Sequence, residues 1–226
     1  MSEAIQPGAA PMPLRVDLVS DVVCPWCIVG YKQFERALES RKHAIDLDLH
    51  WHAFELNPDM PEEGQDVREH LLEKYGPSAG NGSGVRTRLT ELGAQLGFHF
   101  DYSDDMRIVN TFRAHQLLHW AEEMGKQTEL KLALFAAYFS EGRDVNDPGV
   151  LLDVVEGVGL SPEEAESVLA DGRFVQPVRQ DERHWLQEGV QGVPCFVINE
   201  QYIVQGAQDS EAFGRMLDKL LANHQG

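Results

Sequence analysis

The chain has 226 residues, enough to bury a full hydrophobic core in one or two domains. Its 37 acidic residues outnumber 19 basic ones, and a net charge of −18 argues against binding to nucleic acid or to an anionic membrane surface. No apolar run reaches the roughly 18 residues of a membrane span, and residues 1–16 lack the basic and apolar regions of a secretory signal. Three cysteines are too few for a disulfide framework, so we expect a cytoplasmic protein.

The first predicted element is a strand. Residues 1–13 carry three prolines among small residues and predict a flexible N-terminal arm. Leu14 to Ser20 is a short apolar run that Asp17 interrupts. A buried acid is costly unless it is useful. Either Asp17 lies beneath the cysteine pair that follows and tunes it, or it meets water at the edge of the strand.

A C-x-x-C pair follows this strand. Cys24 and Cys27 open a predicted helix, and Pro25 falls in its first turn, where a proline loses no needed hydrogen bond. Cys24 lies at the N-terminus, where unpaired N–H groups and the helix dipole favour the thiolate. Cys27 lies one turn in, on the buried stripe, and should keep a higher pKa. In thiol–disulfide exchange, Cys24 would therefore attack and Cys27 would resolve the mixed disulfide.

The competing interpretation of a C-x-x-C pair is a metal site. A structural zinc site needs four ligands, usually from a second C-x-x-C or an H-x-x-x-H pair, and Cys195 stands alone. His115 and His119 have helical spacing, but HQLLH lacks the glutamate of the motif H-E-x-x-H. No metal is expected. The pair instead favours redox chemistry, which a nearby βαβ pattern supports.

Alternation of apolar and polar residues predicts a half-buried strand over Asp46–Ala53. Together with the first strand and the C-x-x-C helix it forms a βαβ unit, whose crossover should be right-handed. His50 and His52 share the polar face of this strand. We interpret them as partly solvated residues rather than ligands, because no third ligand is evident.

Helical signals alone then continue from about residue 66 to 172. Asp147 and Ser161 are predicted N-caps, each followed by a proline in the first turn. About 115 residues of helix are too many for a crossover in a small sheet, so residues 57–174 are predicted to form an inserted all-helical domain. Its other predicted helices are Asp66–Tyr75, Val85–Leu96, Asn110–Met124 and Leu130–Phe139.

Strand signals return near the C-terminus. After a predicted helix at Val175–Gly189, Cys195–Ile198 and Tyr202–Val204 predict a hairpin, and Asp209 caps a final amphipathic helix. These elements complete the sheet begun by the βαβ unit. The predicted fold class is α/β, with residues 14–56 and 175–226 forming a thioredoxin-like domain around the helical insertion.

Several motifs together resemble the FrnE-like branch of the DsbA family of thioredoxin-like oxidoreductases. The resemblance covers nearly the whole chain from Leu14, and its paired CPWC and GVP motifs are specific. It implies a thioredoxin fold with a helical domain inserted after the first βαβ unit. The matching segments are SDVVCPWC with Gly30, FELNPDMP, Asn110-Thr111 with Ala114-His115, GVQGVPCFVIN and GAQ.

The resemblance assigns a role to Val193-Pro194. In the family this bond is cis and faces the cysteine pair, and the backbone of the preceding residue binds a substrate strand. An ordinary proline at the start of a strand is the alternative. Cys195 departs from the family, which usually has an apolar residue there. It is either a buried small hydrophobe facing away from Pro194 or a third redox thiol.

The leading hypothesis is a cytoplasmic protein disulfide oxidoreductase acting on protein or small-molecule disulfides. Cys24 and Cys27 carry the chemistry, and Pro25, Trp26 and Asp17 tune it. No tightly bound cofactor is expected, and glutathione is a candidate reductant or co-substrate. The branch also resembles 2-hydroxychromene-2-carboxylate isomerases and kappa-class glutathione transferases, but those typically carry serine at the position of Cys24. A binding module with vestigial cysteines is the third hypothesis.

Overall fold

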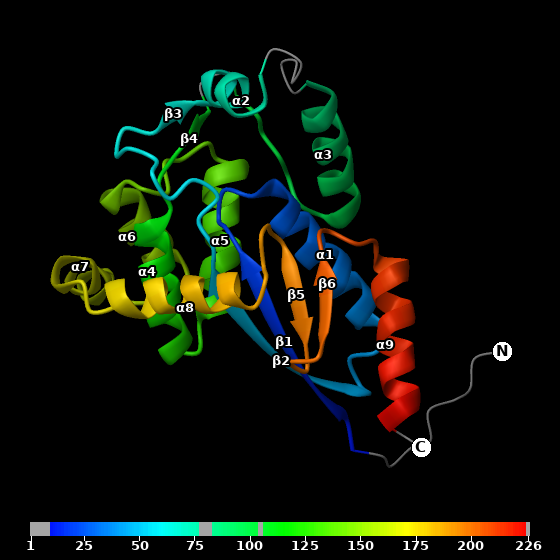
Figure 1. Cartoon of the computed structure of the whole chain (residues 1–226). Helices are drawn as coiled ribbons and strands as arrows, with labels where there is room; N and C mark the ends of the chain where they lie inside the picture. Colours follow the sequence, from blue (N-terminus) through cyan, green and yellow to red (C-terminus); the bar gives the residue numbers. More distant parts are fainter. Residues whose placement is uncertain (1–9, 77–82, 104–105, 225–226) are drawn as a thin grey trace.

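The computed structural model describes residues 10–76, 83–103 and 106–224. Its main feature is a four-stranded mixed sheet of order β2-β1-β5-β6 (Figure 1). β1 pairs in parallel with β2, and both β1–β5 and β5–β6 are antiparallel. The strands are β1 (Met12–Ser20), β2 (Ile45–Ala53), β5 (Cys195–Ile198) and β6 (Tyr202–Gln205).

One face of this sheet packs against helices α1 (Pro25–Glu39) and α9 (Ser210–His224). Phe34 of α1, Phe196 of β5 and Phe213 of α9 form a triangle of ring contacts with centroids 4.9–5.6 Å apart. Asp209 caps α9 as expected, because its carboxylate accepts from the Ala212 N–H at 2.7 Å. The apolar stripes of both helices thus close the core on the cysteine side.

The other face is covered by α8 (Val175–Gln187), which packs on β2. Here Val19 and Cys195 form a small buried cluster with Trp185 and Val190. Side chains alternate along β1, so Leu18 belongs to the core of the α1 face and Val19 to the α8 face. This alternation fixes which residues can reach the cysteine pair.

The helical insertion lies against the sheet rather than apart from it (Figure 1). Trp51 of β2 contacts Tyr31 of α1 and Phe135 of α5, with ring centroids 5.1 and 6.2 Å apart. One continuous apolar core therefore spans both predicted domains. The inserted helices are α2 (Val67–Tyr75), α3 (Ser83–Leu96), α4 (Phe112–Glu123), α5 (Gln127–Phe139), α6 (Pro148–Gly157) and α7 (Pro162–Asp171).

The structure differs from the sequence prediction at two places. β1 begins at Met12, whose N–H donates to the Ala44 carbonyl, so the end of the predicted arm belongs to the sheet. Residues 1–9 lie outside the described part. The region expected to be purely helical also contains β3 (Gln65–Asp66) and β4 (Arg107–Ile108), an antiparallel pair. Two-residue strands carry too little sequence pattern to be predicted.

Candidate active site

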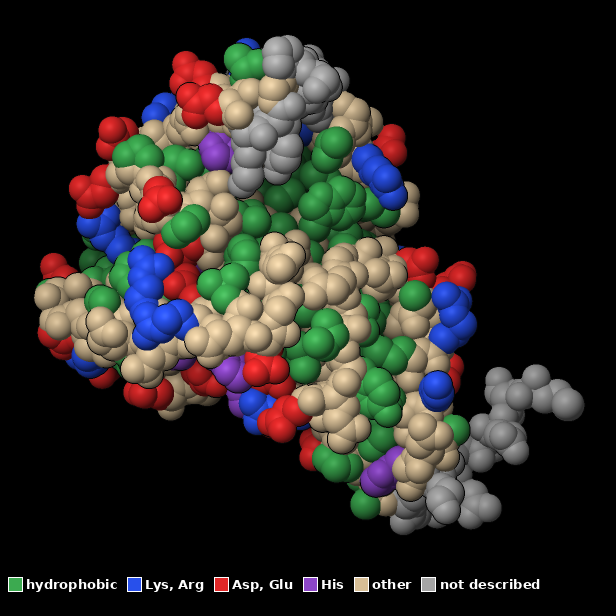
Figure 2. Space-filling view, in the orientation of Figure 1, with side chains coloured by type: hydrophobic (Ala, Val, Ile, Leu, Met, Phe, Trp, Pro, Cys, Tyr) green, Lys and Arg blue, Asp and Glu red, His purple; other side chains and the backbone are tan. Residues whose placement is uncertain are grey.

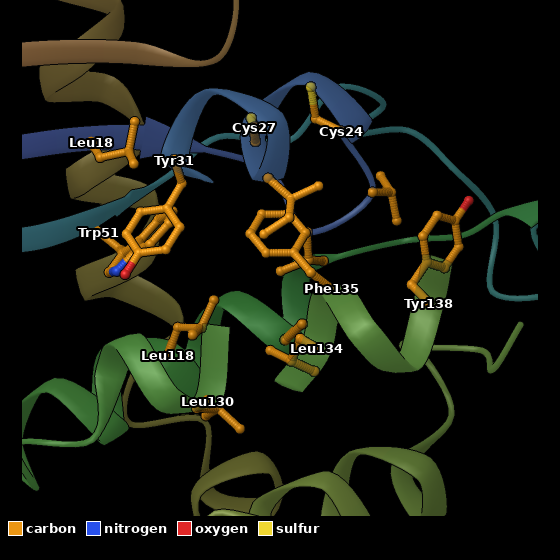
Figure 3. Close-up of a cluster of buried hydrophobic side chains, with 14 of the residues drawn as sticks. Leu18, Cys24, Cys27, Tyr31, Trp51, Leu118, Leu130, Leu134, Phe135 and Tyr138 are labelled. Carbon is orange, nitrogen blue, oxygen red and sulfur yellow. The ribbon is translucent and has the colours of Figure 1, made fainter. Parts of the chain in front are cut away.

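Cys24 lies at the N-terminus of α1, where the sequence predicts it. It is the N-cap residue, with φ −94° and ψ 110°, and Pro25 begins the helix. The Cys24 N–H donates to the Asp21 carbonyl at 3.2 Å, and the Cys27 N–H donates to the Cys24 carbonyl at 3.1 Å. The polypeptide therefore turns sharply from β1 into the helix and brings both sulfurs to its first turn (Figure 3).

The two cysteines have different environments. Cys24 is 4% exposed and lines a cavity, whereas Cys27 is fully buried. Burial raises the pKa of Cys27 well above its usual value, and the neighbouring Cys24 raises it further. A molecule in the cavity could therefore reach Cys24, whereas Cys27 is not accessible.

The Val193-Pro194 bond is cis and lies beside Cys24, as the resemblance implies. The Cys24 Sγ–H donates to the Val193 carbonyl at 3.7 Å. Gly30 permits the close approach of α1 to this loop, because a Cβ at Gly30 would lie 3.1 Å from Pro194 Cγ and 3.4 Å from the backbone of Ala207. The cysteine pair and the proline loop, far apart in the sequence, form one site.

A buried ionic group lies on the same side of the sheet as Cys27. Lys131 of α5 is 1% exposed, and its Nζ lies 3.4 Å from the Ser20 carbonyl. Burial lowers the pKa of Lys131 to about 8, although the Coulombic interactions with Cys27 and Asp21 act to raise it. The Asp21 carboxylate lies 3.3 Å from a ring nitrogen of His115 and accepts from a backbone N–H at 2.8 Å. Burial opposes its charge, but these contacts hold the pKa of Asp21 below its usual value.

Sequence reasoning did not assign Lys131 or Asp21 to the site. Two signals could have found them. Lys131 is a lone cation inside a helix that is apolar nearly all round, which requires a buried partner. Asp21 directly follows the strand that leads into the cysteine pair.

Asp17 does not lie beneath the cysteine pair, so this expectation is corrected. Its side chain is on the α8 face of β1, together with Val19, and the alternative of a water-exposed edge is wrong as well. The buried carboxylate accepts from Arg15 at 2.8 Å and lies 3.0 Å from His52. Burial opposes its charge, but these bonds lower the pKa of Asp17 to about 2. A satisfied ion pair, rather than a redox role, accounts for this acid.

Cys195 and the β2 histidines also belong to the α8 face. Cys195 is fully buried against Val19 and Trp185, and burial raises its pKa to about 11. His52 contacts Asp181 of α8 at 2.8 Å, and His50 contacts Glu122 at 3.0 Å. Within the described ranges, no group of three or more His, Cys, Asp or Glu side chains is arranged to hold a metal ion.

A cavity opens beside Cys24. Its volume is about 620 Å³, and Cys24, Pro25, Trp26 and Val193 line one side of it. α2, α3 and α5 of the insertion supply the opposite side. The guanidinium of Arg88 on α3 lies 5.9 Å from the centre of the Trp26 ring. Hydrophobic side chains gather on the molecular surface between α3 and the start of α1 (Figure 2). A substrate that reaches Cys24 would therefore meet residues of the insertion as well.

Comparison with known proteins shows the same fold. The model of the DSBA-like thioredoxin domain matches residues 15–218. A structure from Streptomyces coelicolor, named as a probable DsbA oxidoreductase, is 36% identical, with a TM-score of 0.85 over 91% of this chain and 89% of that one. The predicted thioredoxin-like fold with a helical insertion is confirmed.

Two more distant structures are similar in fold alone. The cytosolic disulfide reductase DsbM from Pseudomonas aeruginosa, solved with GSH, is 17% identical with a TM-score of 0.64 over 92% of this chain and 99% of that one. A 2-hydroxychromene-2-carboxylate isomerase is 13% identical, with a TM-score of 0.70 over 93% and 98% of the two chains. Among the described helices, none has both the length and the hydrophobicity to cross a membrane.

Proposed function

Because this chain belongs to the DSBA-like thioredoxin domain family, we propose that it is a thiol–disulfide oxidoreductase in which Cys24 attacks and Cys27 resolves. One observation carries the proposal: of two adjacent thiols, Cys24 lines a cavity at a helix N-terminus, whereas Cys27 is buried with a raised pKa. This asymmetry is what a two-step exchange requires.

The exchange starts with the Cys24 thiolate attacking one sulfur of a substrate disulfide. A Cys24–substrate disulfide forms, and the other substrate sulfur leaves as a thiolate. Cys27 then loses its proton and attacks the Cys24 sulfur, which releases the second substrate thiolate and leaves a Cys24–Cys27 disulfide. The substrate gains two electrons, and a dithiol or two molecules of glutathione restore the enzyme.

Lys131 supports the second half of this sequence. Its positive charge lowers the cost of ionising Cys27, against the effect of burial. Because the pKa of Lys131 is lowered to about 8, its amine can also exist unprotonated near neutral pH and accept the Cys27 proton. The Asp21 carboxylate, which contacts His115, supplies the negative charge opposite Lys131. These residues act on Cys27 and do not touch the substrate.

The compartment and the substrate range belong to this proposal. Three cysteines, all free and buried, suit a reducing cytoplasm. In that compartment, electrons would flow from cellular thiols through Cys27 and Cys24 to the substrate. Both protein disulfides and small disulfides are candidate substrates.

The test measures turnover with insulin and with a small disulfide, for the wild type and for Cys24→Ser and Cys27→Ser. We expect Cys24→Ser to lose both activities, and Cys27→Ser to accumulate a stable mixed disulfide that mass spectrometry detects. Retained activity of Cys24→Ser would overturn the proposal. It would assign the disulfide chemistry to Cys27 or Cys195, because serine cannot form the mixed disulfide.

A further inference from the structure

The cavity beside Cys24 has the size and chemistry of a small-molecule site. Its volume of about 620 Å³ lies within the range of roughly 300–1,000 Å³ typical of drug-sized ligands. Most of its lining is apolar, and aromatic rings of Trp26, Tyr102, Tyr138 and Phe139 border it. Such walls favour a flat aromatic ligand, which gains from ring contacts as well as from burial.

Arg86 and Tyr102 are two of the polar side chains of the insertion that line this cavity, together with Asn57, His70 and Tyr138. Arg86 of α3 supplies a fixed positive charge among the described lining residues, in a chain with a net charge of −18. Its guanidinium lies 5.6 Å from the centre of the Tyr102 ring. The Tyr102 hydroxyl is buried and has no hydrogen-bond partner among the described residues. An unsatisfied buried hydroxyl is costly unless a ligand supplies the partner.

Tyr102 is suited to donate a hydrogen bond rather than to ionise. Burial raises its pKa above the usual value, so the hydroxyl stays protonated at neutral pH. Tyr138, which borders the same cavity, differs in this respect because its hydroxyl already donates to the Arg107 carbonyl at 2.7 Å. Arg86 and the Tyr102 hydroxyl, which is occluded and has no partner among the described residues, therefore form a pair of donors whose natural partner is an anionic group.

The shape of the cavity favours a small molecule over an extended polypeptide. Extended chains bind by adding to an open backbone edge; the edges of this sheet are β2 and β6, and the only edge at the cavity among the described residues is the short one that the resemblance implies at Val193. The cavity instead lies between the start of α1 and the inserted helices α2, α3 and α5. Such walls on two sides enclose a compact ligand.

We infer, on the basis of the proposed exchange reaction, that this cavity binds a small aryl disulfide carrying a carboxylate or similar anionic group. Arg86 pairs with the anion, Tyr102 donates a hydrogen bond to it, and the aromatic body lies against the apolar walls beside Cys24. Attack by Cys24 releases one aryl thiolate, and attack by Cys27 on the Cys24 sulfur releases the other. The aryl disulfide is reduced to two thiols, and the enzyme is oxidised to the Cys24–Cys27 disulfide.

The kinetic test compares two aryl disulfides with the reduced protein. Dithiobis(nitrobenzoate) carries carboxylates, whereas dithiodipyridine is uncharged at neutral pH. We expect Arg86→Gln to lower the second-order rate with the carboxylated disulfide about tenfold, the worth of one charge-assisted hydrogen bond, and to leave the uncharged one unchanged. Tyr102→Phe should act in the same direction with a smaller drop. Equal rates for wild type and Arg86→Gln with both disulfides would overturn the inference.

Arg173→Gln is the matched control. Arg173 also places its guanidinium over a ring, 5.8 Å from the centre of Phe174, but does not line the cavity. It removes the same charge from the chain, so any general effect of net charge on an anionic reagent will appear in both variants. A drop of equal size in Arg173→Gln would refute a specific role of Arg86.

A binding test separates this inference from the proposed function. Cys24→Ser removes the attacking thiol, and titration calorimetry with naphthoate then measures binding without exchange. Saturable binding that weakens about tenfold on adding Arg86→Gln supports the inference. Absence of binding overturns the inference, while insulin reduction by the wild type would still uphold the exchange reaction. If Arg86→Gln instead slows insulin reduction as much as reduction of the aryl carboxylate, the cavity receives polypeptide side chains and the small-molecule assignment is wrong.

Discussion

The two faces of the sheet both bury charged residues next to the first strand, but they do so in different ways. On the α8 face, Asp17 and Asp181 surround His52, with contacts of 2.8–3.0 Å. On the α1 face, Lys131 and Asp21 lie near Cys27. One strand thus separates two buried ionic groups of similar composition.

The difference lies in how far each charge is satisfied. On the α8 face, burial opposes the charged forms, but hydrogen bonds outweigh it: the pKa of Asp17 falls to about 2 and that of His52 rises to about 9. On the α1 face contacts also lower the pKa of Asp21, but burial prevails for Lys131 and Cys27, so the pKa of Lys131 falls to about 8 and that of Cys27 rises. The first group holds its charges and stabilises the fold. The second has groups poised to exchange protons, as a catalytic site requires.

The largest expected contrast is between thiols on the two faces. Limited iodoacetamide at neutral pH should modify Cys24 more than a hundredfold faster than Cys195, because a pKa of about 11 leaves only about one part in ten thousand of Cys195 as thiolate. Cys27 should also lag, because it is fully buried. Peptide mapping after timed quenching measures the order. Earlier modification of Cys27 or Cys195 would mean that the attacking thiol is misassigned.

Asp17→Asn tests whether the α8 group is structural. Loss of the carboxylate removes the buried partner of Arg15 and one of the two carboxylates that hold His52, so we expect the free energy of unfolding to fall by about 3 kcal/mol, at the low end of what breaking a buried ion pair costs. Urea denaturation measures it. Asp171→Asn is the control, because it breaks an exposed pair with Arg173 and should leave stability unchanged. Slower release of the mixed disulfide by Asp17→Asn would instead return this acid to the mechanism.

Lys131→Met tests the opposite group. Without the cation, Cys27 is harder to ionise, so release of the Cys24 mixed disulfide should slow about tenfold, the equivalent of one pKa unit. Attack by Cys24 should change little. Methionine fills much of the same apolar space against Trp51 and Phe135, so the fold should survive. Stopped-flow measurement of the single-turnover rate at which the mixed disulfide is released tests this prediction. An unchanged rate would mean that Lys131 has no part in the resolving step.

Local signals predicted most of the fold. The caps predicted at Asp147 and Ser161 are confirmed, because their side chains accept hydrogen bonds from backbone N–H groups in the first turns of α6 and α7. The hairpin of β5 and β6 and the C-x-x-C helix carried equally local patterns. By contrast, β3 and β4 pair across more than forty residues in strands of two, and no local pattern marks such a contact.

Sequence reasoning failed at the site where a choice depended on which face of a strand a side chain occupies. Asp17 and Asp21 flank the same strand end, and the sequence does not show which of the two side chains lies on the face of the cysteine pair. His52 of β2, which contacts Asp17, and the inserted helix that carries Lys131 come from segments distant in the sequence from β1. Only the tertiary fold shows which acid is satisfied and which lies with the thiols.

The smallest expected effect is a pH dependence that originates on the α8 face. His52 is held by Asp17 and Asp181, with Arg15 and His119 nearby, and its pKa rises from about 6.5 to about 9 on folding. Stabilisation by protonated His52 is therefore complete below pH ~6.5 and is lost as the pH rises through about 9.

Between pH ~6.5 and ~7.5, the contribution of His52 should decline by on the order of 1 kcal/mol, since one pKa unit corresponds to about 1.4 kcal/mol. Other groups titrate too: burial raises the pKa of Glu55 to about 7, and its loss of a proton also weakens the fold in this range. The measurement is therefore the difference in the free energy of unfolding between wild type and His52→Gln, taken from urea denaturation at each pH. This difference cancels the Glu55 contribution, because Glu55 pairs with Arg179 and not with His52. A difference that stays constant from pH ~6 to ~9 would mean that His52 is not held in its charged form. The α8 face would then lack the satisfied charges that distinguish it from the α1 face.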